Sequence, residues 1–202
     1  MQVKLERVHA AFTKNLFKAS SIGDSDPKFR GTFVMEPKSE AAIAITKAMQ
    51  KVASEKWGPD AKSVYTTMVK QDRLCLHDGD TKAKFTGFAG NVFVTANSDM
   101  RTEIVRRDGR TQVTEEDGLV HSGCIVDAII DIWAQDDRKW GKRINAGLGP
   151  VRYVEPGENW SGIETPKASS VFEALPDEED VNALFGDGPE DNSGSSTDWG
   201  DD

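Results

Sequence analysis

Alternating apolar and polar positions, interrupted by one helical stretch, dominate the first three quarters of the chain. Five segments combine a period of two with β-branched and aromatic residues, which is typical of strands. In the first of them, Val3 and Leu5 alternate with Lys4 and Glu6. The predicted strands are residues 2–12, 28–35, 88–97, 122–134 and 142–154.

The period changes between the second and third of these strands. Apolar residues recur at helical spacing across residues 39–56, which predicts a helix. Gly58 is placed to end this helix, and Pro59 is placed to begin a shorter one. Residues 71–87 are expected to form a polar connection to the third strand.

Five strands with a helical insertion predict a mainly β (α+β) domain over residues 1–155. The best match is a five-stranded, OB-fold-like Greek-key barrel, a fold that binds through the loops joining strands 1 and 2 and strands 4 and 5. Here these loops are residues 13–27 and 135–141. Residues 100–120 are expected to form an exposed, charged ribbon that turns near Asp108.

Charge divides the chain into two parts of opposite sign. The 202 residues carry a formal net charge of −9. Residues 156–202 hold one cation against thirteen carboxylates, a net charge of −12, whereas residues 1–155 carry +3. The last segment is rich in Pro, Gly and Ser, so it cannot bury enough apolar surface to fold. We expect a mildly basic domain followed by a disordered acidic C-terminal tail, an asymmetry that points to nucleic acid.

Both predicted binding loops carry cations beside an aromatic ring. Unpaired nucleic acid requires this combination, because bases stack on rings while Lys and Arg neutralise the phosphates between them. The clearest pattern surrounds Trp140, although a half-buried surface residue is the competing interpretation and both stay open. Trp133 ends an apolar segment and is expected in the core, and Trp57 is expected to cover the helix end.

The candidate residues for binding single-stranded DNA come from these loops, from the second strand and from the ribbon. For the ribbon, a solvated hairpin is the competing interpretation. We expect the candidates to line a basic groove that holds single strands without sequence preference. They are Lys14, Phe17, Lys28, Arg30, Arg101, Arg106, Arg107, Arg138, Lys139, Trp140, Lys142 and Arg143.

Aromatic residues interrupt the acidic tail, and a segment that only keeps the protein soluble does not need them. With carboxylates in place of phosphates and rings in place of bases, the tail could mimic nucleic acid or dock into a cationic pocket of a partner. Its candidate partner-binding residues are Phe185, Asp198, Trp199, Asp201 and Asp202.

Catalysis has little support in the sequence. Asp78 and Asp80 could hold a divalent cation, but they lie in a sequence typical of turns. Cys75 and Cys124 are too few for a zinc site and are expected to be reduced thiols. The sequence contains no P-loop, G-x-S-x-G or H-E-x-x-H motif. We expect a protein that is not an enzyme and has no catalytic residue, metal or cofactor.

Four stretches resemble a known family. They are ASEKWGPDAK (53–62), RLCLHDGDTKAKFTGFAGNVFVTANS (73–98), TEEDGLVHSGCIVDAIIDIWAQDD (114–137) and GKRINAGLGPVRYV (141–154). Their order and spacing resemble the bacteriophage OB-fold single-stranded DNA-binding proteins, formerly a domain of unknown function. The resemblance implies a barrel that coats single strands during phage DNA replication or recombination, with an acidic C-terminus that recruits replication proteins.

The expected partners are single-stranded DNA and phage or host replication proteins, in the cytoplasm of an infected bacterial host. No segment is long and apolar enough for a membrane span or a secretory signal, so no membrane is expected. A homo-oligomer or a cooperative assembly on DNA stays open. Two alternative functions also stay open: a metal-dependent nuclease that uses Asp78 and Asp80, and a DNA mimic that inhibits a host protein through the tail.

Overall fold

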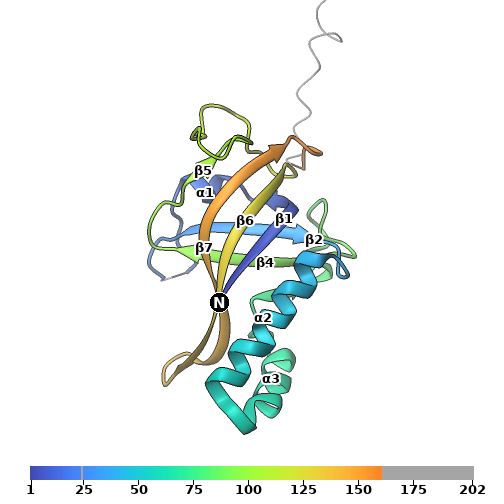
Figure 1. Ribbon diagram of the computed structural model, residues 1–202, viewed down its shortest axis with the longest axis vertical. Coiled ribbons are helices and arrows are strands. Elements are labelled where there is room, and N and C mark those ends of the chain that lie inside the picture. Colours follow the sequence, from blue (N-terminus) through green and yellow to red (C-terminus); the bar gives the residue numbers. More distant parts are fainter. Residues whose placement is uncertain (24, 161–202) are drawn as a thin grey trace, which may run out of the picture. The chain divides into compact units, whose positions relative to one another are not determined.

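One seven-stranded sheet organises the part of the chain that the computed structural model describes, residues 1–23 and 25–160 (Figure 1). Its order is β3-β4-β2-β1-β6-β7-β5. β4 also pairs in parallel with β7, through Asn97 and Gly147, so β1, β2, β4, β7 and β6 form a closed ring of paired strands. The strands are β1 (Gln2–Ala11), β2 (Phe29–Met35), β3 (Leu76–Asp78), β4 (Val92–Ser98), β5 (Ile104–Val105), β6 (Ile125–Asp137) and β7 (Gly141–Glu155).

The five strands of this ring are the five that the sequence predicts. The expected mainly β architecture with a helical insertion is therefore confirmed, and the ring of pairings supports the expected OB-fold-like arrangement. The expectation for residues 71–87 is wrong in part, because β3 and the 3₁₀ helix η2 (Gly79–Lys82) form there. β3 pairs with β4 and so forms an edge of the sheet.

The insertion between β2 and β3 holds α2 (Glu40–Trp57), the 3₁₀ helix η1 (Gly58–Asp60) and α3 (Ala61–Lys70). α2 begins after Ser39, whose hydroxyl accepts a hydrogen bond from the Ala42 N–H at 3.3 Å. It ends at Gly58, whose φ of 50° suits glycine. α2 packs against β1 and β6, as its apolar periodicity predicts. Among the described helices, none is long and apolar enough to cross a membrane.

The core lies within the ring of strands and between the ring and α2. Burial raises the pKa of the Cys75 thiol to about 12 and that of Cys124 to about 11. Both are free cysteines, as expected. The largest fully buried side chains of the ring come from inward-facing strand positions and include Leu5, Phe33, Ile130, Ile132 and Ile144.

The two predicted binding loops differ from expectation. Residues 13–27 contain a short helix, α1 (Lys14–Phe17). Residues 135–141 are mostly strand, since β6 continues to Asp137 and β7 begins at Gly141. The prediction of a loop over all of residues 135–141 is wrong, because the polar residues that follow Trp133 continue the strand pairing of β6 with β7. Figure 1 shows this hairpin beside α2 and α3, whereas α1 and β5 lie at the opposite end of the body.

The charged ribbon turns at Asp108, as predicted. Three hydrogen bonds hold its carboxylate, from the hydroxyl and the N–H of Thr111 and from the N–H of Arg110, and they lower the pKa of Asp108 to about 2. Ile104 and Val113 are buried at the base of the ribbon, so it is anchored rather than wholly exposed.

Packing continues past the predicted domain end at residue 155. The N–H of Trp160 donates to the carbonyl of Ser122 at 2.9 Å, and its ring lies 4.9 Å from the ring of His9. Residues at the start of the predicted disordered tail therefore pack on the body as far as Trp160, the last residue that the structure describes. The rest of the tail lies outside the described residues, with its candidate residues Phe185, Asp198, Trp199, Asp201 and Asp202.

Candidate nucleic-acid interface

Cations of the first loop, β2 and the ribbon gather at one end of the body, and we call this group the first-loop cluster. Three of its six side chains are already paired with carboxylates. Lys18 lies 3.2 Å from Glu115, and Lys28 lies 3.0 Å from Asp99. Arg106 pairs in the same way with Asp117 at 2.9 Å. The members are Lys14, Lys18, Lys28, Arg30, Arg101 and Arg106.

Two predicted binding residues of this region, Phe17 and Arg30, are buried. Phe17 is 8% exposed and belongs to the core, and the guanidinium of Arg101 lies 5.9 Å from its ring centre. The prediction that Phe17 stacks on bases is therefore wrong for this conformation, because α1 turns the ring inward. Arg30 is also 8% exposed and donates to the carbonyl and hydroxyl oxygens of Ser20, so its role here is to hold the first loop against β2.

The β6–β7 turn carries the second group, which we call the hairpin cluster. Asp137 shapes the turn by accepting hydrogen bonds from the N–H groups of Lys139 and Trp140, at 2.8 and 3.0 Å. Trp140 is 57% exposed and has the Lys139 ammonium 4.9 Å from its ring centre. The members are Arg138, Lys139, Trp140, Lys142 and Arg143.

The helical insertion supports this hairpin from one side. Trp57 donates a hydrogen bond through Nε1 to Asp136 at 3.0 Å, and the Lys142 ammonium lies 5.8 Å from the Trp57 ring centre. Arg73 donates to the carbonyl of Trp140 at 3.4 Å. Trp57 thus sits at the helix end, as expected, and also fixes the hairpin. The exposed ring of Trp140 is held on a braced turn.

Trp133 corrects another expectation. The sequence places it in the core, yet the side chain is 44% exposed. The reason is strand alternation: Ile132 points into the core, so its neighbour must point outward. Asp127 and Asp131, which alternate in step with Trp133, are the sequence signal for this outward-facing position. The outer face of β6 therefore presents a second exposed tryptophan.

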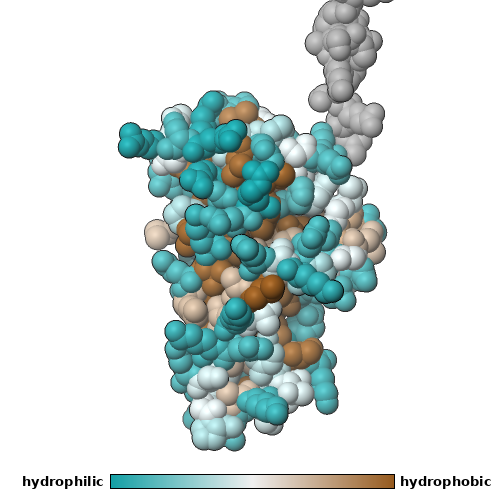
Figure 2. Space-filling view, turned by 45° about the vertical axis from the view of Figure 1, so that its right-hand side comes forward, coloured by the Kyte–Doolittle hydropathy of each residue, from teal (hydrophilic) through white to brown (hydrophobic). Residues whose placement is uncertain are grey.

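The two clusters do not form one contiguous group. Within the described residues, no hydrogen bond, ion pair or ring contact joins a member of one cluster to a member of the other. Figure 2 shows a face of the molecule on which hydrophilic side chains dominate and apolar side chains are exposed in patches. A single DNA-binding groove that joins the two clusters would have to cross the surface of the sheet between them.

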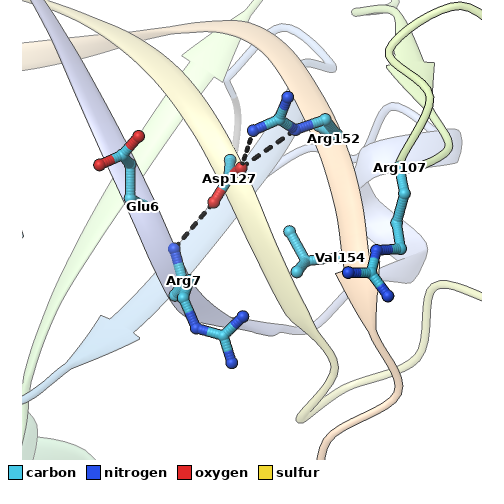
Figure 3. A pocket seen from close by; sticks show the side chains of 6 residues that line it. All are labelled: Glu6, Arg7, Arg107, Asp127, Arg152 and Val154. Carbon is cyan, nitrogen blue, oxygen red and sulfur yellow. Dashed lines mark hydrogen bonds and ion pairs between the residues drawn. The ribbon is translucent and has the colours of Figure 1, made fainter.

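A third cationic site combines Arg107, a predicted candidate on the ribbon, with residues of β1, β6 and β7 that the sequence does not single out (Figure 3). Arg7, Arg107 and Arg152 line a pocket of about 420 Å³. Burial alone would raise the pKa of Asp127, but hydrogen bonds from the Arg7 N–H and the Arg152 guanidinium lower it overall. Sequence patterns do not reveal Arg7 and Arg152, because these two residues are far apart in sequence from each other and from Arg107.

A fourth group surrounds Lys82, whose ammonium lies 4.4 Å from the ring centre of Phe93 and 5.5 Å from that of Phe12. Partial burial lowers the pKa of Lys82. Most of these rings are covered, and Phe85 is the exception at 39% exposed. The group packs the η2 segment onto β2 and β4.

The acidic residues considered for a metal site serve local structure. Asp78 accepts a hydrogen bond from the Asp80 N–H at 2.9 Å, and Asp80 accepts one from the Gly90 N–H at 2.8 Å. In the part of the chain that the structure describes, no group of three or more His, Cys, Asp or Glu residues could hold a metal ion. The nuclease alternative therefore gains no support from this geometry.

Comparisons with known proteins agree with an interface for single strands. The family described as Enterobacter phage Enc34, ssDNA-binding protein matches residues 1–182. "Putative protein p50" of Acyrthosiphon pisum secondary endosymbiont phage 1 is 32% identical over 167 residues, which cover 80% of this chain and 88% of that protein.

Two solved structures share the fold. The single-stranded DNA-binding protein from bacteriophage Enc34 in complex with ssDNA has a TM-score of 0.63 at 19% identity, covering 79% of this chain and 89% of that one. The single-stranded DNA-binding protein gp2.5 encoded by bacteriophage T7 has a TM-score of 0.51 at 12% identity, covering 82% and 97%.

Proposed function

The chain belongs to the family of the Enterobacter phage Enc34 ssDNA-binding protein, and from that premise we propose that it holds single-stranded DNA without sequence preference during phage replication or recombination. It is a phage-type single-stranded DNA-binding protein rather than an enzyme. The observation that carries the proposal is the family match over most of the chain. The exposed, braced Trp140 among cations adds a physical reason for it.

The hairpin cluster is suited to the two chemical parts of a single strand. The exposed face of Trp140 offers a stacking surface for a base, worth about 1–3 kcal/mol per stacked base. Arg138, Lys139 and Arg143 have no ion-pair partner among the described residues, so they are free to neutralise phosphates. Each neutralised phosphate releases counterions, and affinity therefore falls as salt rises.

The acidic tail is the regulatory part of the proposal. Its net charge of −12 over residues 156–202 opposes the +3 of the preceding residues. The tail competes with DNA for the cationic surface and, once displaced, recruits phage or host replication proteins. Because it is tethered, it acts at an effective concentration set by its own length rather than by the protein concentration.

The test is a titration with oligo-dT at two salt concentrations. The full chain and a truncation after Trp160 are compared, because Trp160 packs on the body. The truncated protein is expected to bind more tightly, most clearly at low salt. Equal or weaker binding would contradict tail competition, and no binding by the truncated protein would favour a DNA mimic. Incubating labelled DNA with Mg²⁺ or Mn²⁺ tests for nuclease activity, and none is expected.

A further inference from the structure

The outer face of the sheet forms a continuous cross-strand row between the two clusters. Partners in a paired ladder point to the same side of a sheet, so the strand register assigns the row directly. Arg30 of β2 pairs with Asn97 of β4, which pairs with Gly147 of β7. Gly147 in turn pairs with Asp131 of β6. The row starts at Arg30, beside the first loop, and ends at Asp131 of β6, the strand that leads into the β6–β7 turn.

A trough of about 360 Å³ follows this row, and it offers neutral chemistry. The amides of Gln2 and Asn97 and the backbone around Gly147 line it, together with the apolar side chain of Met100. Its two carboxylates are neutralised by ion pairs: Asp131 lies 2.7 Å from the N-terminal ammonium, and Asp99 lies 3.0 Å from Lys28. Amides, backbone and thioether suit a flat, uncharged base.

Gly147 is the floor of the trough, and its lack of a side chain has no structural cause. A Cβ atom at Gly31 would lie 2.7 Å from Leu148, and one at Gly149 would lie 2.8 Å from the Ile129 carbonyl, so the fold requires both glycines. At Gly147 the nearest atom would be 3.6 Å away, an ordinary contact, and the backbone is not left-handed. Glycine weakens a strand, and in a strand interior it often marks a site where a ligand approaches the backbone.

Trp133 does not line the trough but follows it on the same outer face of β6. It pairs with Asn145, which is the next outward-facing pair after Asp131 with Gly147 and the one before Gln135 with Arg143. Its ring is therefore on the same outer face as the trough, between the glycine floor and an exposed guanidinium of the hairpin cluster. Along a single strand, bases alternate with phosphates. The exposed Trp133 ring can stack on a base, and the neighbouring guanidinium can neutralise a phosphate.

We infer that this trough is a base-binding subsite for single-stranded DNA, with Gly147 as the surface that a nucleotide approaches and Trp133 as its stacking ring. The strand runs over the outer face of β6, β7 and β4 and thereby connects the hairpin cluster to the first-loop cluster. The inference rests on the proposed function and adds the path of the strand and two residues outside the predicted loops.

The test pairs two kinds of substitution in the full chain, measured by oligo-dT titration and by thermal unfolding. Gly147→Val fills the floor of the trough and is expected to weaken oligo-dT binding about tenfold, because its side chain occupies the space of the nucleotide. The melting temperature is expected to stay equal or rise, since valine favours a strand and its Cβ atom meets only ordinary contacts at this position. Trp133→Ala is expected to weaken binding about 5- to 150-fold, the range for one lost base stack. Trp133→Phe should retain most of the affinity.

Ile43→Ala is the matched control, because Ile43 is as exposed as Trp133, at 45%, but lies on α2. It should bind like the wild type. If Gly147→Val unfolds, Gly147→Ala replaces it, because the Cβ atom alone meets only ordinary contacts. Wild-type affinity in both the Gly147 and the Trp133→Ala variants would overturn the subsite. Failure of the wild type itself to bind oligo-dT would instead overturn the proposed function.

Discussion

The first-loop cluster and the hairpin cluster have similar compositions but different electrostatic states. In the first, Lys18, Lys28 and Arg106 each pair with a carboxylate, and the aromatic ring of Phe17 is in the core. In the second, Trp140 is exposed, and the closest ion pair, of Lys142 with Asp136, is at 3.9 Å. A count of cations and rings in the sequence therefore does not distinguish structural charges from available ones.

The difference has a thermodynamic consequence for DNA binding. A phosphate that pairs with one of the three ion-paired cations of the first-loop cluster must displace a carboxylate, whereas one that pairs with an unpaired cation of the hairpin cluster displaces only water and counterions. Exposed ion pairs are worth at most about 1 kcal/mol each, so displacement is feasible but reduces the gain. We therefore expect the hairpin cluster to contribute more binding free energy per residue than the first-loop cluster.

The greatest difference is expected in the free energy of unfolding after removal of the Phe17 ring or the Trp140 ring. Phe17→Ala should lower the free energy of unfolding by about 3–5 kcal/mol, because it leaves a cavity in the core. Trp140→Ala should change that free energy by no more than about 0.5 kcal/mol, since the ring is largely in solvent. Urea unfolding of both variants measures this. A stable Phe17→Ala variant that has lost DNA binding would show that Phe17 is a binding ring after all.

The next effect compares the cations of the two clusters. Replacing Arg138, Lys139 and Arg143 together by Gln should reduce the slope of log affinity against log salt by about 2, at about 0.7 per phosphate contact on a single strand. Replacing Lys18, Lys28 and Arg106 by Gln should reduce it less, because those cations are already paired. Titrations at several salt concentrations give both slopes. Equal slopes would contradict the difference between the clusters.

A smaller effect concerns one stacking ring. Trp140→Ala should weaken oligo-dT binding by about 1–3 kcal/mol, whereas Trp140→Phe should keep most of the affinity. The expected loss has a simple physical reason, which is that alanine offers no flat surface to a base. A loss near zero would return Trp140 to the interpretation of a half-buried surface residue.

The smallest effect tests the ribbon through pH. Hydrogen bonds from Thr111 and Arg110 lower the pKa of Asp108 to about 2, below the ordinary value of 3.8. Folding therefore favours the charged form of Asp108. Its contribution to the free energy of unfolding is complete above about pH 4 and is lost as the pH falls through about 2. Asp108→Asn should lower the melting temperature at pH 6, and the difference from wild type should shrink between pH 4 and pH 2. A difference that stays constant between pH 4 and pH 2 would contradict this role of the Asp108 carboxylate.

The strands of the ring and the helical insertion could be predicted because their apolar periodicity is local information. The exposure of Trp133 was also predictable, since Asp131 stands two residues earlier on the same face of the strand, but the apolar character of the segment as a whole favoured the core. The role of Gly147 depends on what a Cβ atom would meet in space, which only the strand register reveals. The arginine pocket escaped prediction for a similar reason, because Arg7 and Arg152 meet only through the pairing of β1 and β7 with β6.

In the proposed complex, single strands lie on the outer face of β6 and β7, between the hairpin and the trough. Photocrosslinking of an oligonucleotide that carries halogenated uracil to the full chain, followed by mass spectrometry of the crosslinked peptides, tests it most directly. Crosslinks are expected in peptides that contain Trp133 or Trp140. Crosslinks confined to the arginine pocket or to the rings around Lys82 would contradict it.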